Sequence, residues 1–284
     1  MKVLVLGASG MLGHAVLRLL ASSEGYEAVG SVRSASALRL LPVDVHDKVI
    51  TGVDVENPDS LVSLFARTCP DVVINCIGLV KQLAQADDPL AALPINALLP
   101  HRLARLCQVA GARLVHVSTD CVFSGEKGNY IESDPSDARD LYGRSKYLGE
   151  VDFPNAITLR TSIIGHELDG AHGLVGWFLS QHQKVRGFRR AIFSGLPTVE
   201  LARVIRSYVI PRPELRGLYH VSADPINKYD LLMLIAQTYG KTIEIVPDDQ
   251  LVIDRSLDSL RFRNETGYQP RPWPELVHRM KDFA

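Results

Sequence analysis

Short apolar runs alternate with amphipathic stretches along the first 165 residues of the chain. The runs are rich in Val, Ile and Leu, which is typical of strands buried on both faces of a sheet. They predict strands over residues 2–6, 26–32, 49–55, 71–77, 113–118 and 156–164. The stretches between them predict helices over residues 14–21, 91–110 and 141–151, and one that begins at 57. This alternation predicts an α/β fold with a parallel, doubly wound sheet.

The regular alternation ends after residue 165, where a polar, glycine-containing loop begins. Later segments predict short helices over residues 198–208 and 228–239 and a strand over 218–221. We therefore expect a dinucleotide-binding domain over residues 1–165 and a smaller α/β substrate lobe over 166–284. Segments around 217–223 are expected to return to the main sheet, and a ligand should lie between the two parts, at the carboxyl ends of the strands.

Composition and charge exclude several classes of function. The 284 residues are 46% hydrophobic and 22% charged, with a net charge of −1, so nothing favours binding to nucleic acid or to an anionic membrane. No apolar run approaches the ~18 residues of a membrane span, and the strand-like start has no signal-peptide pattern. The four cysteines lack CxxC spacing, which indicates reduced thiols in a cytoplasmic protein and no metal site.

The first thirteen residues contain the most informative motif. An apolar run ends at Gly7, and Gly10 and Gly13 follow before an amphipathic stretch. In a strand–turn–helix context, such glycines allow a tight turn, close approach of backbone N–H groups to a phosphate, and close helix packing. The helix N-terminus then faces the anion. The turn therefore predicts a pyrophosphate-binding site formed by Gly7, Ser9, Gly10, Met11, Leu12 and Gly13.

Polar side chains gather where two further predicted strands end. Residues 75–78 (Asn-Cys-Ile-Gly) end the fourth strand, and residues 118–120 (Ser-Thr-Asp) end the fifth. Tyr142 and Lys146 are four residues apart, which places a phenol and an ammonium on one face of a helix. Such a pair is common on solvated helices, and the two neighbouring strand ends are what favour a catalytic interpretation.

With these elements together, the chain resembles the extended short-chain dehydrogenase/reductase (Rossmann-type) superfamily along essentially its whole length. Within it, the chain is most similar to the dTDP-4-dehydrorhamnose reductase group. The stretches that carry this resemblance are residues 118–125 (STDCVFSG), 142–150 (YGRSKYLGE) and 159–162 (LRTS).

The resemblance implies three catalytic residues. Tyr142 would protonate the carbonyl oxygen as hydride reaches the carbonyl carbon, and Thr119 would hydrogen-bond that oxygen. Lys146 would bind the nicotinamide ribose. Its ammonium, with the positive ring of the oxidised cofactor, would lower the pKa of the Tyr142 phenol from about 10.

The cofactor is expected to be NADP(H), with NAD(H) as the alternative. Arg33 follows the second predicted strand, and no acidic residue stands there. An Arg at this place accommodates the 2′-phosphate of NADP, whereas an acid would bind the free 2′-hydroxyl of NAD. The resemblance also places Asp54 and Val55 beside the adenine. The strand end at Cys76, Ile77 and Gly78 completes the expected cofactor site.

The substrate would be a nucleotide-linked 4-keto-6-deoxy sugar for surface polysaccharide synthesis. The group usually has Tyr where this chain has Cys121, and Trp where it has Ile163, so the reaction carries over better than the particular sugar. The residues expected at the substrate are Lys81, Thr119, Asp120, Cys121, Ile163, Arg190 and Arg255.

Two alternatives stay open. An epimerase or dehydratase could use the same fold, although a dehydratase of this superfamily typically has Asp-Glu after the threonine, and Cys121 follows Asp120 here. A non-catalytic NADP-binding regulatory subunit is the other, although such proteins commonly lose the Tyr/Lys pair. We also expect a homodimer and no nucleic-acid or membrane partner.

Overall fold

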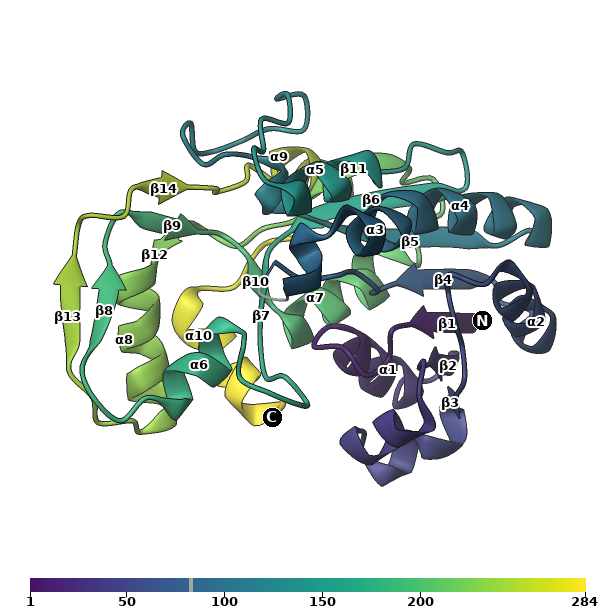
Figure 1. The fold of residues 1–284 in the computed structure, drawn as a ribbon, viewed down its shortest axis with the longest axis horizontal. Helices are drawn as coiled ribbons and strands as arrows, with labels where there is room; N and C mark the ends of the chain where they lie inside the picture. Colours follow the sequence, from purple (N-terminus) through teal and green to yellow (C-terminus); the bar gives the residue numbers. More distant parts are fainter. Residues whose placement is uncertain (82–83) are drawn as a thin grey trace.

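The computed structural model describes residues 1–81 and 84–284. At the centre of these described residues is a parallel sheet of seven strands, in the order β11-β6-β5-β4-β1-β2-β3 (Figure 1). Helices cover both of its faces, which confirms the predicted doubly wound α/β fold. The strands of the sheet are β1 (Lys2–Leu6), β2 (Glu27–Ser31), β3 (Val49–Ile50), β4 (Val72–Asn75), β5 (Arg113–Thr119), β6 (Ala156–Thr161) and β11 (Gly217–His220).

The helices begin and end at residues with clear local causes. Asn57 caps α2 by accepting the Asp59 N–H at 2.9 Å, and Pro58 occupies the first helical position. The helix predicted over 91–110 is α3 and α4 joined by a π-helical turn, Leu93–Leu98. The α-helices are α1 (Gly13–Ala21), α2 (Pro58–Thr68), α3 (Pro89–Ala92), α4 (Leu99–Ala110), α5 (Leu141–Leu148), α6 (Leu174–Ser180), α7 (Thr198–Val204), α8 (Lys228–Tyr239), α9 (Leu260–Thr266) and α10 (Trp273–Asp282).

The two faces of the sheet are buried in separate hydrophobic clusters. Because successive side chains of a strand point to opposite faces, Val3 and Val5 of β1 pack with α1 and α7 in one cluster. Leu4 and Leu6 pack with α2 and α4 in the other. All four side chains are at most 1% exposed, and burial of one such side chain contributes about 1.5–3 kcal/mol. The alternation thus fixes the strand register and the three layers.

Two predicted strands are too long. The strand predicted over 49–55 ends at Ile50, because Gly52, at a left-handed φ of +78°, turns the chain. The strand predicted over 156–164 is interrupted at Ser162. The following β7 (Ile163–Ile164) leaves the main sheet and pairs with β10 (Leu196–Pro197).

A smaller lobe lies beside the carboxyl ends of the sheet strands, on the left in Figure 1, where the arrowheads of β1 and β4 point toward it. It contains α6, α8 and two small sheets. However, α7 packs on α1, and β11 pairs with β6 in the main sheet. The second half of the chain therefore contributes to both parts, and the boundary at residue 165 stays a prediction. The strands of the lobe are β8 (Val185–Phe188), β9 (Ala191–Phe193), β12 (Ile226–Asn227), β13 (Ile245–Asp248) and β14 (Ile253–Asp254).

Across the described residues, no helix has both the length and the apolar composition that a membrane crossing requires.

Candidate active site

Three glycines shape the turn between β1 and α1. Gly7 has a left-handed backbone (φ +78°), and a Cβ there would lie 2.8 Å from Cγ1 of Ile77. A Cβ on Gly13 would lie 2.0 Å from the Gly7 carbonyl oxygen, so only glycine fits at this position. The Gly10 N–H donates to the same oxygen at 2.9 Å and closes the turn. The other predicted cofactor residues within this turn are Ser9, Met11 and Leu12.

The turn is a suitable cradle for a dinucleotide pyrophosphate. Helix α1 begins at Gly13, and its first turn has no acidic residue that would repel an anion. Its unpaired N–H groups and the positive end of its dipole therefore point toward the turn. Since the three glycines place no side chain between backbone and anion, these residues fit the group that the sequence predicts.

The carboxyl ends of β2 and β3 lie near the glycine turn, because both strands run parallel to β1. Arg33 follows β2 and is exposed, and the hydroxyl of Ser34 next to it caps a 3₁₀ turn. Asp54 is exposed beyond β3, where its carboxylate accepts the Glu56 N–H at 3.0 Å, and Val55 next to it is half-buried. Among residues 1–81 and 84–284, the Arg33 side chain has no ion-pair partner, whereas the Asp54 carboxylate is already engaged in a turn.

The carboxyl end of β4 borders the glycine turn from the other side. The Cys76 N–H donates to the Leu6 carbonyl at 3.2 Å, which continues the sheet ladder past the strand. Ile77 lies against Gly7, as described above. A Cβ on Gly78 would lie 3.7 Å from Nζ of Lys146. The structure thus brings the predicted cofactor residues of β4 between the glycine turn and the lysine of α5.

Helix α5 is fixed at the edge of the sheet by its cap and by its lysine. Asp140 caps the helix by accepting the Gly143 N–H at 2.7 Å. Lys146 is 5% exposed, and its ammonium donates to the Val117 carbonyl of β5 at 2.9 Å. Burial lowers the pKa of Lys146 to about 8, against the opposing effects of Glu150 and Cys76. The ammonium is therefore held in place but loses its proton more readily than an exposed lysine.

Tyr142 lies on the same helix, one turn before Lys146, and it is half-buried. The groups of the protein alone shift its pKa in the direction opposite to the one expected with the oxidised cofactor. Burial raises the pKa of the Tyr142 phenol, and the nearby Cys121 and Asp120 raise it further, whereas contact with Thr119 acts in the opposite direction. The Lys146 ammonium donates to the Val117 carbonyl and is not one of the main causes of this shift. The phenol is therefore kept protonated, which is the form that a proton donor needs.

Thr119 and Asp120 lie at the end of β5, both buried. The Thr119 hydroxyl donates to the Asp120 carboxylate at 3.2 Å and accepts the Cys121 N–H at 3.1 Å. Burial raises the pKa of Asp120, and Arg255 and several hydrogen bonds, including one from Ser162, oppose the increase. The Thr119 hydroxyl thus lies beside the phenol and donates its hydrogen bond to the Asp120 carboxylate.

A pocket of about 190 Å³ opens next to this group and is lined by Cys121, Phe123, Asp140 and Arg255, among others. Arg255 reaches it from the lobe, where its Nε donates to the Phe123 carbonyl at 2.8 Å. Burial raises the pKa of the Cys121 thiol to about 12, so that it stays neutral. The pocket is therefore mainly polar, with two arginines (Arg139 and Arg255) and two carboxylates (Glu126 and Asp140) in its lining.

The other predicted substrate residues have mixed surroundings. Lys81 forms an ion pair with the helix cap Asp140 at 2.6 Å, which places its charge at the start of α5. Ile163 is half-buried in β7. Arg190 is exposed near Asp249. Its carbonyl accepts the Ile253 N–H at 3.0 Å, which places it close to the segment that carries Arg255. Its role at the substrate stays a prediction.

Two residues of the site were missed from the sequence. Asn96, in the π-helical turn, bonds the backbone of Leu79 through both its amide atoms and donates to Ser145 of α5 at 3.2 Å. The sequence feature that could have identified Asn96 is its polar side chain within a long, mainly apolar helical pattern. Lys228 begins α8 close to Asp120 and Arg255, and burial lowers its pKa. No local pattern distinguishes Lys228, because the fold alone brings it to the site.

The fold and this arrangement define a dinucleotide-binding protein of the extended short-chain dehydrogenase/reductase type. The family model described as "RmlD substrate binding domain" matches residues 1–282, so the chain belongs to that family.

Relatives and solved structures agree with this membership. A probable low-salt glycan biosynthesis reductase of Haloferax volcanii is 32% identical over 62% of this chain, so that the chain spans 58% of that protein. The spore coat polysaccharide biosynthesis protein SpsK of Bacillus subtilis is 29% identical over 97% of this chain and 95% of its own. The crystal structure of the dTDP-4-dehydrorhamnose reductase of Bacillus anthracis, in complex with NADP, has the same fold. Its TM-score is 0.80 at 21% identity, over 100% of this chain and 99% of that one.

Proposed function

We propose that this protein is an NADPH-dependent reductase of a nucleotide-linked 4-keto-6-deoxy sugar. The observation that carries the proposal is the meeting of Thr119, Tyr142 and Lys146 at one edge of the sheet, across from the glycine turn. Membership of the RmlD family and the glycan and polysaccharide roles in the names of its relatives support it. The reaction would supply surface polysaccharide precursors in the cytoplasm, and the enzyme would be a homodimer.

The site assigns a role to each of the three side chains. When bound, NADPH supplies the hydride that reduces the C4 carbonyl carbon. The protonated Tyr142 phenol gives its proton to the carbonyl oxygen, so that the ketone becomes an alcohol. Thr119 turns its hydroxyl from Asp120 to the same oxygen and stabilises the charge that develops there. Lys146 holds the cofactor ribose beside the phenol.

The alternatives have less support. A dehydratase needs a further acid/base pair after the threonine, and the Cys121 thiol, with its pKa raised to about 12, is poorly suited to that role. A regulatory subunit has no need of a protonated phenol and a buried ammonium on one helix, and this chain has both.

The preference for NADPH rests on Arg33. Arg33→Asp should weaken NADPH binding by about 10–100-fold, the range expected for a lost charge-assisted hydrogen bond, and should improve NADH binding. Fluorescence titration of both cofactors measures the change. The matched control is Arg39→Asp, which makes the same charge change at another exposed arginine and should leave both affinities unchanged. Equal affinity of the wild type for the two cofactors would contradict the assignment.

The pKa of Lys146 predicts an alkaline limit on activity. Because the lysine is charged only below about pH 8, kcat/KM for NADPH should fall as the pH rises through 8. The raised pKa of Tyr142 keeps the phenol protonated over the same range. A profile of kcat/KM from pH 6 to 10 measures this decrease. In Lys146→Arg the side chain stays charged, so the decrease above pH 8 should be absent. A wild-type profile that is flat to pH 10 would show that the Lys146 charge is not required.

Cys121 and Ile163 determine which sugar we expect. Both are smaller than the aromatic residues usual in the group, and space near Cys121 suits a bulkier C2 substituent such as an acetamido group. We expect a UDP-linked 2-acetamido-4-keto-6-deoxyhexose to be reduced at least as well as dTDP-4-dehydrorhamnose. The test compares kcat/KM for the two sugars. Differences of this size in shape give about 1–3 kcal/mol of discrimination.

Filling the space supplies the control for that comparison. Cys121→Tyr should shift the preference toward the dTDP sugar, because the larger ring occupies the volume that the acetamido group would take. Strong preference of the wild type for the dTDP sugar would overturn the acetamido proposal and keep the reductase.

A further inference from the structure

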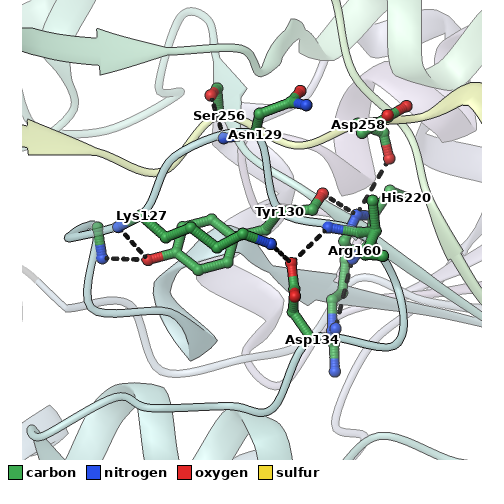
Figure 2. Close-up of polar contacts among 10 residues, drawn as sticks. Lys127, Asn129, Tyr130, Asp134, Arg160, His220, Ser256 and Asp258 are labelled. Atoms are coloured by element: carbon green, nitrogen blue, oxygen red, sulfur yellow. Dashed lines mark hydrogen bonds and ion pairs between the residues drawn. The ribbon is translucent and has the colours of Figure 1, made fainter.

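A chain of buried polar side chains lies at the junction of α5, β6 and β11. Figure 2 shows the end of this chain where Arg160 meets His220 and His220 meets Tyr130 and Asp258. Glu150 follows α5, Arg160 is in β6 and His220 is in β11. Arg160 is 2% exposed and His220 is fully buried, and the Glu150 side chain is 10% exposed. Buried charges cost desolvation free energy and are poor sources of stability. Their presence therefore calls for a role other than stabilising the fold.

One end of the chain fixes the end of β5. The Arg160 guanidinium donates from Nε and Nη2 to the two oxygens of Glu150, both at 2.6 Å. The hydroxyl of Ser118 donates to the same carboxylate at 2.8 Å. Ser118 immediately precedes Thr119 at the end of β5. The bond from Ser118 to this carboxylate therefore fixes the end of the strand, and with it the place of the Thr119 hydroxyl.

The geometry allows one protonation state for His220. Arg160 Nη1 lies 3.3 Å from His220 Nε2, and a guanidinium only donates, so Nε2 must be an acceptor. The ring proton is then on Nδ1, which points to the Tyr130 carbonyl at 3.0 Å and the Asp258 carbonyl at 3.2 Å. Burial, aided by the charge of Arg160, lowers the pKa of His220 to about 4, which keeps the ring in this neutral form at physiological pH.

The other end of the chain joins two segments distant in sequence. Tyr130 is in the loop that follows Thr119, and its N–H donates to the Ser256 carbonyl at 2.8 Å. The Asp258 N–H donates back to the Tyr130 carbonyl, also at 2.8 Å. The rings of Phe123 and Tyr130 stack at 4.0 Å between centroids, and Arg160 covers Phe123.

The same two segments carry the pocket residues. Arg255 belongs to the segment that Tyr130 holds, and its Nε bonds the Phe123 carbonyl. The loop over residues 121–130 and the segment over 254–258 are thus joined along their length, and His220 donates to both of them.

We infer that Glu150, Arg160 and His220 are positioning residues, which fix Thr119 and Arg255 relative to each other across the pocket. The inference rests on the proposed function, in which these two residues meet the sugar substrate. Glu150 acts through Ser118, and His220 acts through the joined segments. The hydrogen bonds of the His220 ring go to Arg160, Tyr130 and Asp258, and none of these three lies in the glycine turn or at Arg33, so loss of His220 should affect the sugar and leave the cofactor unaffected.

The test replaces His220 and separates its two bonds. His220→Phe keeps a ring and removes the hydrogen bonds at both ring nitrogens. We expect kcat/KM for the keto sugar to fall by about 10–100-fold, as for a misplacement of about 1 Å. A raised KM and a lowered kcat should both contribute, while the Kd for NADPH stays within about twofold. His220→Asn restores a donor near Nδ1 and should recover most of the loss. His220→Gln restores an acceptor near Nε2 and should recover little.

The outcomes divide cleanly. Unchanged kcat and KM in a folded His220→Phe protein would overturn the inference, and so would a parallel loss of NADPH affinity, which indicates general destabilisation. If His220→Phe does not fold, the Asn and Gln variants still decide, because equal activity of the two would contradict a role through the Tyr130 and Asp258 carbonyls. Failure of the wild type to reduce any keto sugar would instead overturn the proposed function.

Discussion

Replacing Tyr142 with Phe should lower kcat by about 10²–10⁴-fold, the usual contribution of general acid catalysis. The substitution removes the phenol proton that burial, together with nearby Cys121 and Asp120, holds in place. It leaves the ring, the helix cap at Asp140 and the bond from Lys146 to β5 intact. The fold and the NADPH affinity should therefore stay as in the wild type. Steady-state kinetics with a keto sugar, together with cofactor titration, measures both.

The control for this variant is on the same helix. Tyr147 is 47% exposed and is not one of the residues that line the pocket at Cys121, and Tyr147→Phe makes the same chemical change there. It should leave kcat unchanged. A Tyr142→Phe protein that is correctly folded and turns over at the wild-type rate would remove Tyr142 from the mechanism.

Adding one methyl group at Gly13 should severely damage the cofactor site. A Cβ there would lie 2.0 Å from the carbonyl oxygen of Gly7, so the turn or the start of α1 must move. Overpacking of this kind costs about 1–3 kcal/mol. We expect Gly13→Ala to lower the free energy of unfolding by that amount and to weaken NADPH binding at least tenfold. Denaturant titration and cofactor fluorescence provide the two measurements.

Gly10→Ala separates the two effects. A Cβ at Gly10 would be 3.3 Å from the Gly7 oxygen, which the turn accommodates with a small shift. The stability of this variant should stay close to that of the wild type, while NADPH affinity falls because the methyl group stands where the pyrophosphate approaches. Unchanged NADPH affinity in both variants would show that the cofactor does not bind at this turn.

Much of the fold was predictable because its signals are local. The alternation of Val3 and Val5 with Leu4 and Leu6, between two faces both covered by helices, is written in the sequence as a continuous apolar run. The caps of α2 are also local. The ends of β3 and β6 were not predictable, because in each case apolar residues continue past the point where the chain leaves the sheet, at Gly52 or at Ser162.

The site was predictable where motifs carry it and unpredictable where tertiary contacts do. The positions of Thr119, Tyr142 and Lys146 follow from their strand and helix. The direction of the Tyr142 pKa shift does not, because it depends on burial and on the nearby Cys121 and Asp120. Lys228 and His220 reach their places through the packing of the second half of the chain, and no spacing in the sequence links them to β5.

The most direct test of the reductase assignment follows the hydride itself. The enzyme is incubated with NADPH deuterated at C4 of the nicotinamide and a UDP-linked 2-acetamido-4-keto-6-deoxyhexose, and the product is analysed by mass spectrometry and NMR. We predict one deuterium at C4 of the sugar alcohol for the wild type, and little or none in the same time for Tyr142→Phe. Tight NADPH binding without transfer of deuterium to this sugar or to any dTDP- or GDP-linked 4-keto-6-deoxyhexose would contradict the assignment and favour a non-catalytic NADP-binding subunit.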